Sequence, residues 1–401
     1  MRRWWLVAVF AVTVFVVFWG VSVPGALTDL EVYRAGGAAW LHGVPLYTSE
    51  FPFWLPFTYP PVSAVLFGVL AILPMVVAAT ALTVAGLVGL SVTTLLAVPY
   101  SRVVAVLVVA VALVFEPVRT TLLFGQVNLA LMGLVAADCL LPLRRLPRGV
   151  LVGVAAAVKL TPLVFVLFFL SRRQVQPAVT AMVTFAAVSG AGMLFAPADS
   201  VRYWHQTIFA ADRIGGAAFV TNQSLRGALS RLDLTPSVTQ VCWVVLAALV
   251  VVVAWCGARR AADPVVALLV VAAAGLLLSP VSWSHHWVWI APAVFVLAIR
   301  AYRNRGAVAV LAAVVVVFAV GHRFLPHGRN QELAWVWWQH VLGNSYVLTA
   351  LVFLLWAALA SRPRGADAQL TDRVGTRPAS FDRSMNRVLR PVKTSNHVRD
   401  Q

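Results

Sequence analysis

The amino-acid sequence predicts an all-α polytopic membrane protein, and three observations carry that prediction. Of the 401 residues, 61% are hydrophobic and only 11% are charged, whereas soluble domains carry roughly 25% charged residues. Apolar runs of about 20 residues, long enough to cross a bilayer as helices, recur along nearly the whole chain. The short alternating segments of membrane barrels are missing, so we expect a bundle of about 10–12 transmembrane helices.

The expected spans follow one another with short connections. In chain order they are 4–23, 61–78, 80–98, 103–115, 128–143, 149–170, 176–195, 237–257, 264–280, 286–300, 306–320 and 344–360. The first run is longer than the roughly 7–15 apolar residues of a signal peptide, and no small-x-small cleavage pattern follows it, so we interpret it as a retained span. Twelve crossings put both termini inside and leave three outer loops, 24–60, 196–236 and 321–343.

The net charge of +17 comes from short basic clusters between the apolar runs. We interpret them as cytoplasmic topology signals rather than as a nucleic-acid site. The clusters are Arg2–Arg3, Arg172–Arg173, Arg259–Arg260, 300–305 and 362 onward. Twelve simple crossings would place Arg144, Arg145 and Arg148 outside. An alternative solves this conflict: Pro162 interrupts the 149–170 span, and if that span and 103–127 both double back, every cluster becomes cytoplasmic.

Two parts of the chain differ in composition. Residues 1–360 form the predicted membrane domain. From Arg362 hydrophobicity collapses, and we expect 361–401 to be a basic, disordered cytoplasmic tail with a weak attraction to anionic lipid. The three cysteines lie within or at the ends of apolar spans, so neither a disulfide framework nor a metal cluster is indicated. No internal repeat is visible.

Polar residues gather in or beside the outer loops rather than within the spans. The groups are Asp29 and Glu31, 57–61 (FTYPP), 125–128 (GQVN), 221–227 (TNQSLRG) and 278–287 (LSPVSWSHHW). This distribution predicts one site at the outer membrane–water boundary rather than a path across the membrane.

The stretch that follows the first span contains two carboxylates with different expected roles. Thr28-x-x-Glu31 fits a capping box, which gives Glu31 a structural role at a helix start. Asp29, Tyr33 and Trp40 then share one helix face with Gly36 or Gly37, so Asp29 stays free and the two rings offer surfaces on which sugars stack. The alternative is an interfacial amphipathic helix in which Asp29 only favours the helix dipole.

Further candidates lie at the next membrane boundaries. Tyr59 precedes two prolines that suit the entry into a helix, which is an architectural role on its own. Gln126 and Asn128 place two amides where they hydrogen-bond either sugar hydroxyls or broken backbone. Lys159 is one of two lysines beside 29 arginines, and an isolated cation in an apolar stretch is a functional candidate. It meets either a lipid phosphate or Asp138 on a neighbouring span.

The pair His285–His286 follows a Ser-Pro break, and a Ser284 cap would put both residues in the first turn of a helix. A helix N-terminus lowers the pKa of histidine, and its free N–H groups form a phosphate cradle. The alternative is an aromatic interface belt with Trp283, Trp287 and Trp289. A zinc site is disfavoured, because adjacent histidines point in different directions and no spacing completes a ligand set.

The second outer loop has a basic character. Asn222 and Gln223 offer amides, and Asn222-Gln223-Ser224 also matches the weak glycosylation sequon. Arg202, His205, Arg213 and Arg226 suit an anionic head group, although an ordinary solvated loop explains the same composition.

Taken together, these motifs resemble glycosyltransferase family eighty-seven of the GT-C superfamily. The resemblance rests on their order from about residue 27 to 300: DLEVYRAGGAAWLHGVPLY, FTYPP, GQVN, VKLTP, NQSLRG and SPVSWSHHWVW. Within the family, the chain resembles the actinobacterial polyprenol-phosphate-mannose-dependent alpha-(1,2)-mannosyltransferases, which act on phosphatidylinositol mannosides or lipomannan.

The resemblance implies a GT-C-like bundle whose extracytoplasmic loops carry helices, with residues 1–360 as the catalytic domain. It implies an inverting transfer from polyprenyl-phosphate-mannose to a mannosylated lipid acceptor, on the outer face of the plasma membrane. From the residues themselves we expect no cofactor and no metal, because no carboxylate cluster indicates a bound metal. In the family the carboxylate after the first span is the proposed general base, and Asp29 matches it. The remaining assignments are our inference: His285 or His286, only one of which can face the site, holds phosphate together with Lys159 and Arg226. Tyr33, Tyr59, Gln126, Asn128, Asn222 and Gln223 contact substrates.

A transporter or flippase of lipid-linked sugars is the rival interpretation. Such a protein typically has broken helices with polar groups near the midplane and repeat symmetry between its halves. The chain has two possible breaks but no visible repeat, so the transferase is favoured. The sequence leaves the acceptor open between a glycolipid and a growing mannan.

Overall fold

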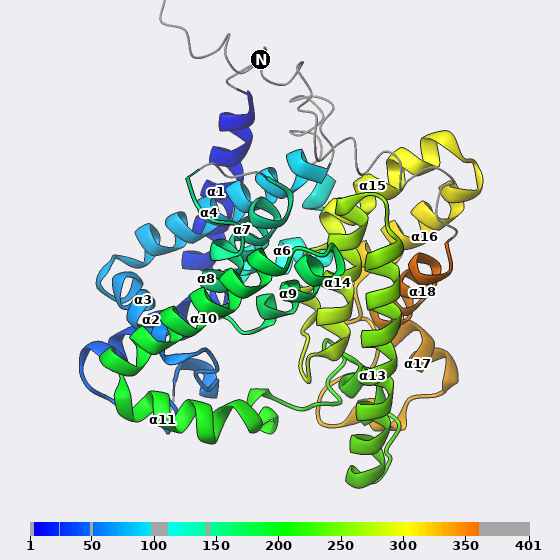
Figure 1. The fold of residues 1–401 in the computed structure, drawn as a ribbon. Coiled ribbons are helices and arrows are strands. Elements are labelled where there is room, and N and C mark those ends of the chain that lie inside the picture. The colour runs from blue at the N-terminus through cyan, green and yellow to red at the C-terminus, as the bar shows by residue number, and fades with distance from the viewer. Residues whose placement is uncertain (1–3, 24, 49–50, 98–110, 142–144, 361–401) are drawn as a thin grey trace, which may run out of the picture. The chain divides into compact units, whose positions relative to one another are not determined.

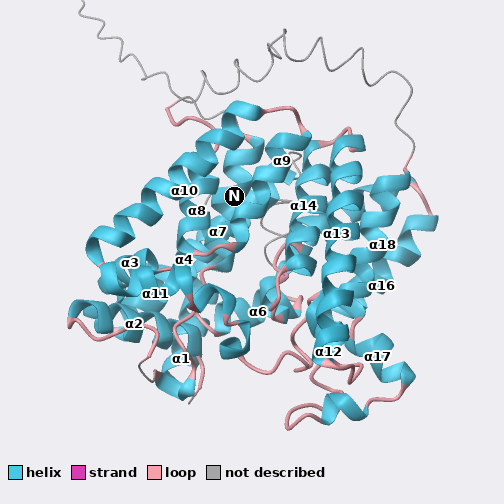
Figure 2. Cartoon of the chain, turned by 60° about the horizontal axis from the view of Figure 1, so that its bottom comes forward, coloured by secondary structure: helices cyan, strands magenta, loops and turns pink. Residues whose placement is uncertain are grey.

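The structure, a computed structural model, describes residues 4–23, 25–48, 51–97, 111–141 and 145–360. The predicted tail, 361–401, lies outside these residues. The described part is helical, and its one β-bridge joins Asn222 to Trp283. Loops gather near α6, α12 and α17 (Figure 2). The all-α fold class is therefore confirmed.

The helices follow the chain as labelled in Figure 1. They are α1 (Trp4–Ser22), α2 (Thr28–Leu41), α3 (Pro61–Ile72), α4 (Met75–Ala97), α6 (Glu116–Leu123), α7 (Asn128–Leu140), α8 (Val150–Val158), α9 (Val166–Ser171), α10 (Val175–Phe195), α11 (Pro197–His205), α12 (Leu225–Ser230), α13 (Pro236–Arg260), α14 (Pro264–Leu278), α15 (Ile290–Arg303), α16 (Gly306–Val320), α17 (Trp337–Gly343) and α18 (Ser345–Leu359). Short 3₁₀ turns include η2 (Thr161–Phe165) and η5 (Ser284–His286).

Among the described residues, three helices are long and apolar enough to cross a membrane alone, namely α4, α10 and α13. Two bent pairs pass the same test together: α6 with α7 across a bend of 117°, and α17 with α18 across 68°. Several shorter apolar helices accompany them, including α14 and α16. The chain is therefore a membrane protein, while the number of 10–12 crossings stays a prediction.

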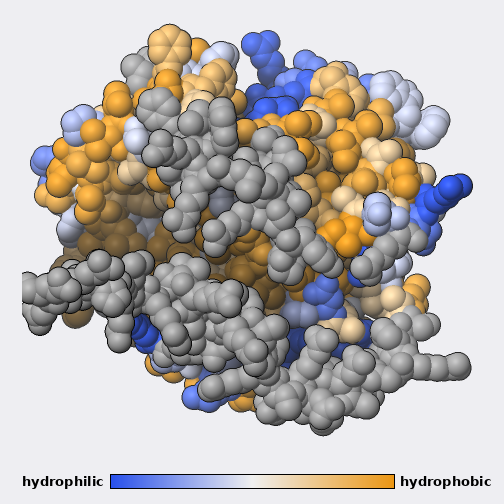
Figure 3. Space-filling view, turned by 90° about the horizontal axis from the view of Figure 1, so that it is seen from above, coloured by the Kyte–Doolittle hydropathy of each residue, from blue (hydrophilic) through white to orange (hydrophobic). Residues whose placement is uncertain are grey.

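The outward faces of the long helices carry exposed apolar side chains. Leu194 on α10 is 81% exposed, and Val241 on α13 is 63% exposed. Apolar side chains also cover large parts of the surface visible in Figure 3. In a water-soluble protein, apolar patches of this size are rare outside interaction sites. Contact with lipid tails explains them here.

The predicted span 61–78 is wrong. α3 ends at Ile72 and α4 begins at Met75, because Pro74 has no N–H to continue a helix and disfavours helical geometry at the residue before it. α3 instead packs along α2, where the Arg34 guanidinium donates to the carbonyls of Leu70 and Leu73 at the end of α3. The two helices form an antiparallel pair.

The predicted span 149–170 does double back. α8 runs parallel to α10, since Gly149 lies against the Pro177 carbonyl and Gly153 lies four residues further along, against the Ala181 carbonyl. The chain between them must therefore return, and the Arg148 guanidinium lies 5.6 Å from the centre of the Phe169 ring. A straight helix would separate these residues by ~30 Å. This half of the topology alternative is confirmed.

As a result, the basic cluster at Arg148 lies at the same end of the helices as Arg172, which removes the charge conflict for this segment. The other half of the alternative concerns 103–127. α6 and α7 do meet at a sharp bend, but residues 98–110 lie outside the described part of the chain, so this half stays a prediction.

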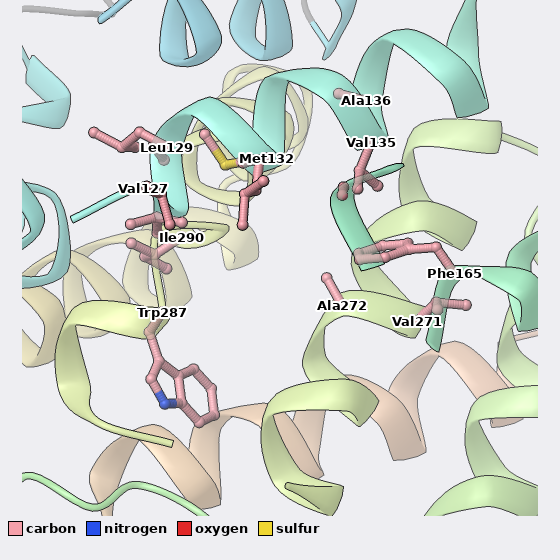
Figure 4. Packing of buried hydrophobic residues seen from close by; sticks show 14 of the residues in the cluster. Val127, Leu129, Met132, Val135, Ala136, Phe165, Val271, Ala272, Trp287 and Ile290 are labelled. Atoms are coloured by element: carbon pink, nitrogen blue, oxygen red, sulfur yellow. The ribbon is translucent and has the colours of Figure 1, made fainter. Parts of the chain in front are cut away.

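The core around α7 positions the site. Gly89 on α4 and Gly133 on α7 bring the two backbones into contact, as small residues do between membrane helices. The opposite side of α7 faces η2 and α14: Figure 4 shows Met132 and Val135 around the same space as Phe165 and Ala272. Both the start of α7 and the break between α8 and η2 are thereby held in place.

Candidate active site

The N-terminus of α2 is anchored on the corner between α6 and α7. The Leu27 N–H donates to the Leu123 carbonyl at 2.8 Å, and the Asp29 N–H donates to the Phe124 carbonyl at 3.0 Å. These bonds satisfy N–H groups that a helix start leaves without intrahelical partners. Asp29 therefore occupies a fixed position beside residues 124–128.

The predicted capping box is wrong. Leu27 is the N-cap, in a left-handed conformation with φ 56°, and no side chain caps the helix. The Thr28 hydroxyl donates to the Gly25 carbonyl at 2.5 Å, and the Glu31 N–H bonds to the Leu27 carbonyl. Carbonyls of α6 occupy the place that a side-chain cap would take. Glu31 has no capping role. Of the two roles predicted for the carboxylates, the structural role of Glu31 is therefore wrong.

A buried network supports Asp29. Gln126 Oε1 accepts hydrogen bonds from the Tyr33 hydroxyl at 2.7 Å and from the Tyr59 hydroxyl at 3.3 Å. The two hydroxyls lie 2.7 Å apart, and the Gln126 side chain also hydrogen-bonds Asp29. Tyr33 is fully buried, and Gln126 is 6% exposed. Sugar contact by these three residues stays a prediction, whereas their contacts indicate that they hold the carboxylate.

Glycines on the Asp29 face let another backbone approach α2. Gly37 lies against the backbone of Phe67, and Gly36 lies against the Phe57 ring. The Tyr33 ring stacks on Phe67 with centroids 4.5 Å apart. In the structure these glycines therefore serve close packing of the 57–72 segment on α2.

The environment of Asp29 changes its acidity. Burial raises the pKa of the carboxyl group to about 6, although the Gln126 hydrogen bond and the Lys159 charge act in the opposite direction. A carboxyl group with this pKa is mostly ionised at neutral pH and is a stronger base than an ordinary aspartate. Such a value is suited to general base catalysis.

Lys159 lies at the break between α8 and η2, where its backbone is extended. Its Nζ atom donates to Asn128 Oδ1 at 2.8 Å and lies 3.3 Å from His286 Nε2. The alternative pairing with Asp138 is wrong, because Asp138 accepts the N–H groups of Gly149 and Val152 at the start of α8. The cation is thus directed toward the end of the helices that carries Asp29.

The two histidines do not begin a helix, contrary to the sequence prediction. They belong to the turn η5, and α15 begins only at Ile290. The Ser284 hydroxyl donates to Glu116 rather than capping a helix. The His286 N–H bonds to the Trp283 carbonyl and so is not free for a phosphate cradle. The break at Ser279–Pro280 is followed by a loop whose turn forms its own hydrogen bonds.

Both imidazoles face the site, at right angles to each other, so the prediction that only one of them can face it is wrong. His285 Nε2 lies 3.4 Å from Gln126 Nε2, on the Asp29 side, whereas His286 meets Lys159. Burial, reinforced by Lys159 and Arg323, lowers the pKa of His285 to about 3, so its ring is neutral. The neighbouring Trp287 packs against Phe318 and Tyr346 in the core, which argues against a simple aromatic belt.

An apolar pocket opens beside Lys159. It encloses about 530 Å³, including the part open to solvent. Asn128, Lys159, Thr161 and His286 form its polar part; its other lining residues, from α7, η2, α14 and the start of α15, include Met132, Val135, Phe165, Ala272 and Trp289. A cation beside an apolar pocket fits an anion that carries a hydrocarbon chain.

The second outer loop supports the histidine turn. The Ser282 N–H donates to Asn222 Oδ1 at 3.0 Å, and the Gln223 N–H donates to the Ser282 carbonyl at 2.7 Å. Asn222 is fully buried, which makes the sequon inaccessible. Arg226 lies half-buried on α12. The predicted substrate contacts of these three residues stay predictions.

Two charged residues, one fully buried and one half-buried, were missed by the sequence reasoning. Arg231, fully buried, donates to Asn344 at 2.7 Å and to the Asn222 carbonyl at 2.9 Å. Glu116 accepts three side-chain hydroxyls. Glu116 directly follows an apolar run, which is the signal that identified Lys159, whereas Arg231 lies in a polar loop between Arg226 and Asp233 and gave no such signal. Among the described residues, no group of three histidine, cysteine or acidic side chains is placed to hold a metal ion.

Comparison with known proteins identifies the family of the chain. The profile described as "Glycosyltransferase family 87" matches residues 57–280, a range that contains Lys159 and starts after Asp29. No solved structure matches the chain.

Curated relatives match over most of their length. A protein of Mycobacterium tuberculosis (strain ATCC 25618 / H37Rv) is 39% identical over 92% of this chain and 90% of its own. A protein of Mycolicibacterium smegmatis is 39% identical over 86% and 87%. Both are named polyprenol-phosphate-mannose-dependent alpha-(1-2)-phosphatidylinositol mannoside mannosyltransferases. A second M. tuberculosis protein (strain CDC 1551 / Oshkosh), named as the corresponding pentamannoside mannosyltransferase, is 33% identical over 83% and 81%.

Proposed function

The chain belongs to glycosyltransferase family 87, and from that premise we propose that it is an inverting mannosyltransferase. It moves mannose from polyprenyl-phosphate-mannose to a mannosylated lipid of the phosphatidylinositol mannoside or lipomannan type, and it forms an alpha-(1,2) linkage. The names of the relatives support both donor and acceptor. They give no support to the transporter alternative.

One observation carries the proposal: a basic carboxylate and a lone lysine share one site beside an apolar pocket. The charge of Lys159 lowers the pKa of Asp29, and Lys159 lines the pocket with His286 and Asn128. The donor has the complementary parts, since its phosphate needs a cation and its hydrocarbon chain needs an apolar surface. We place the phosphate at Lys159 and part of the polyprenyl chain in the pocket.

The reaction then requires one base and one stabilised leaving group. Asp29 takes the proton of the acceptor hydroxyl while the hydroxyl oxygen attacks C1 of mannose from the side opposite the phosphate. The bond between C1 and the phosphate oxygen breaks, and its electron pair leaves with polyprenyl phosphate. Lys159 stabilises the charge that develops on that oxygen. A single displacement converts the beta-linked donor into an alpha-linked product.

Neutral histidines suit the leaving-group side. Each neutral imidazole donates one hydrogen bond, so His286 can bind a phosphate oxygen beside Lys159 without adding a charge. His285 lies on the other side, next to Gln126, where it supports the base. We assign phosphate contact to His286 and support of the Asp29 network to His285.

We place the site on the outer face of the plasma membrane. The support is the charge distribution: Arg148, Arg172 and Arg260 lie at the ends of α7, α9 and α13, where they donate to helix-terminal or adjacent carbonyls. Basic clusters of this kind mark cytoplasmic ends. Asp29 follows the first span from a basic N-terminus, which puts it at the opposite end.

The test is transfer in membranes with and without the full chain. Radiolabelled polyprenyl-phosphate-mannose is supplied with phosphatidylinositol mannosides, and the product linkage is determined by alpha-mannosidase digestion and methylation analysis. We expect a new alpha-(1,2)-linked mannose only when the chain is present. A chain that is inserted in the membrane yet transfers no mannose to any mannosylated lipid would overturn the proposal.

A further inference from the structure

A carboxylate outside the proposed chemistry ties three segments together behind the site. Glu116, at the start of α6, accepts the Ser284 hydroxyl at 2.8 Å and the Thr120 hydroxyl at 3.0 Å on Oε1. Its Oε2 accepts the Tyr346 hydroxyl at 3.1 Å. These donors come from η5, α6 and α18. An ionised carboxylate only accepts hydrogen bonds, so Glu116 selects one orientation of all three hydroxyls.

The neighbouring arginine does not compete for this carboxylate. Arg119, one turn further along α6, directs its guanidinium to the carbonyls of Val114 and Ala319. Within the described part of the chain, these three hydroxyls are therefore the side-chain hydrogen-bond donors to Glu116. A half-buried carboxylate depends more on its hydrogen-bond donors than an exposed one does. If a donor is lost, a partly buried charge is left without a hydrogen bond, which costs free energy.

The Ser284 contact is the one that reaches the site. Ser284 is buried and begins the turn that presents His285 to Gln126 and His286 to Lys159. The far side of the same turn is also held by α6, since the Thr121 hydroxyl donates to the His285 carbonyl at 2.6 Å. α6 thus holds the turn by two hydrogen bonds, one to the Ser284 side chain and one to the His285 carbonyl.

We propose that Glu116 is a positioning residue, which fixes the His285–His286 turn through Ser284 and thereby aligns both imidazoles with Gln126 and Lys159. It touches neither substrate. The inference rests on the proposed transferase function, because the turn matters only if the imidazoles serve the base and the phosphate. A rotation of the turn would move both rings at once, one on each half of the site.

Three full-length variants test this inference in membranes, with wild-type transfer measured first. Glu116→Gln keeps the shape but replaces one accepting oxygen by a donating NH₂, and Ser284→Ala removes the hydroxyl. Thr120→Ala is the matched control, because it removes a donor to the same oxygen from outside the turn. We expect kcat to fall about tenfold in Glu116→Gln and Ser284→Ala, with the KM for the acceptor unchanged, and to stay within about twofold in Thr120→Ala.

The double variant Glu116→Gln/Ser284→Ala separates positioning from general destabilisation. If the two residues act through one contact, the double variant loses little more kcat than the worse single variant. Multiplicative losses, or an equal loss in Thr120→Ala, would overturn the inference. A wild-type chain without transfer would instead overturn the proposed function, so the two failures are distinguishable.

Discussion

The two halves of the site solve opposite problems with similar materials. Around Asp29, burial among two phenols and one amide raises the pKa of the carboxyl group, although the hydrogen bond from the amide acts in the opposite direction. Around Lys159, an amide oxygen and a neutral imidazole hold a cation. The first half makes an acid weaker and hence a better base, whereas the second keeps a positive charge available. The comparison shows that neutral polar groups hold the charged side chain in each half. We therefore expect variants of the two halves to show different kinetic defects.

The largest effect is expected on the carboxylate side. Asp29→Asn keeps the size of the side chain but removes the base, so kcat should fall by about 10²–10⁴-fold. Expression and membrane insertion should remain near normal. Glu31→Gln is the matched control two residues away, and it should retain nearly full transfer because Glu31 contacts no part of the buried network. Retained transfer in Asp29→Asn would remove Asp29 from the role of base.

The cation side should show its defect mainly in donor binding. Lys159→Met removes a charge-assisted hydrogen bond to phosphate, worth about 1.5–3 kcal/mol, which corresponds to an increase of about 10–100-fold in the donor KM. Lys159→Arg should recover part of this loss, since it keeps the charge. An unchanged donor KM in Lys159→Met would show that the phosphate lies elsewhere.

The two histidines lie between the two halves, and we expect their substitutions to change different kinetic constants. His286→Ala removes a group beside Lys159, so we expect a several-fold higher donor KM. His285→Ala removes a support of the Gln126 network, and its loss should appear in kcat. Steady-state kinetics of both variants with varied donor concentration make the comparison. Identical or negligible changes would favour a packing role for both rings.

The smallest effect should come from the tyrosine support. Tyr33→Phe removes one hydrogen bond to Gln126 while the ring keeps its stacking on Phe67. A buried hydrogen bond of this kind contributes about 0.5–1.5 kcal/mol, so kcat should fall about two- to tenfold. A loss as large as that of Asp29→Asn would mean that the hydroxyl takes part in the chemistry directly.

The sequence predicted the helices better than their connections. Apolar runs located nearly every described span within a few residues, because lipid requires continuous hydrophobic helix. The failure at 61–78 came from Pro74, which looks like a residue inside an apolar run but separates two helices with different roles. The return of the chain after α8 was an alternative that the sequence itself offered. Pro162 interrupts the apolar run, and the return places the basic cluster at Arg148 on the same side as the other basic clusters.

The site was predicted in part, for a physical reason. Asp29, Lys159 and the histidines stood out because polar groups next to apolar runs are costly and need a purpose. Their partners could not be read in the same way. The pairing of Gln126 with Tyr33, and of Glu116 with Ser284, joins residues 93 and 168 positions apart. Such pairs depend on how helices pack, and the capping and helix-start predictions failed where tertiary contacts replaced local ones.

The pH dependence of kcat/KM in wild type and in Lys159→Met tests the coupling between the two halves most directly. Asp29 must be ionised to act as a base, so wild-type kcat/KM should fall tenfold per pH unit below about 6. The Lys159 charge lowers the pKa of Asp29, so removing it should move this acidic limb to higher pH. A limb at the same pH in both proteins would contradict the account.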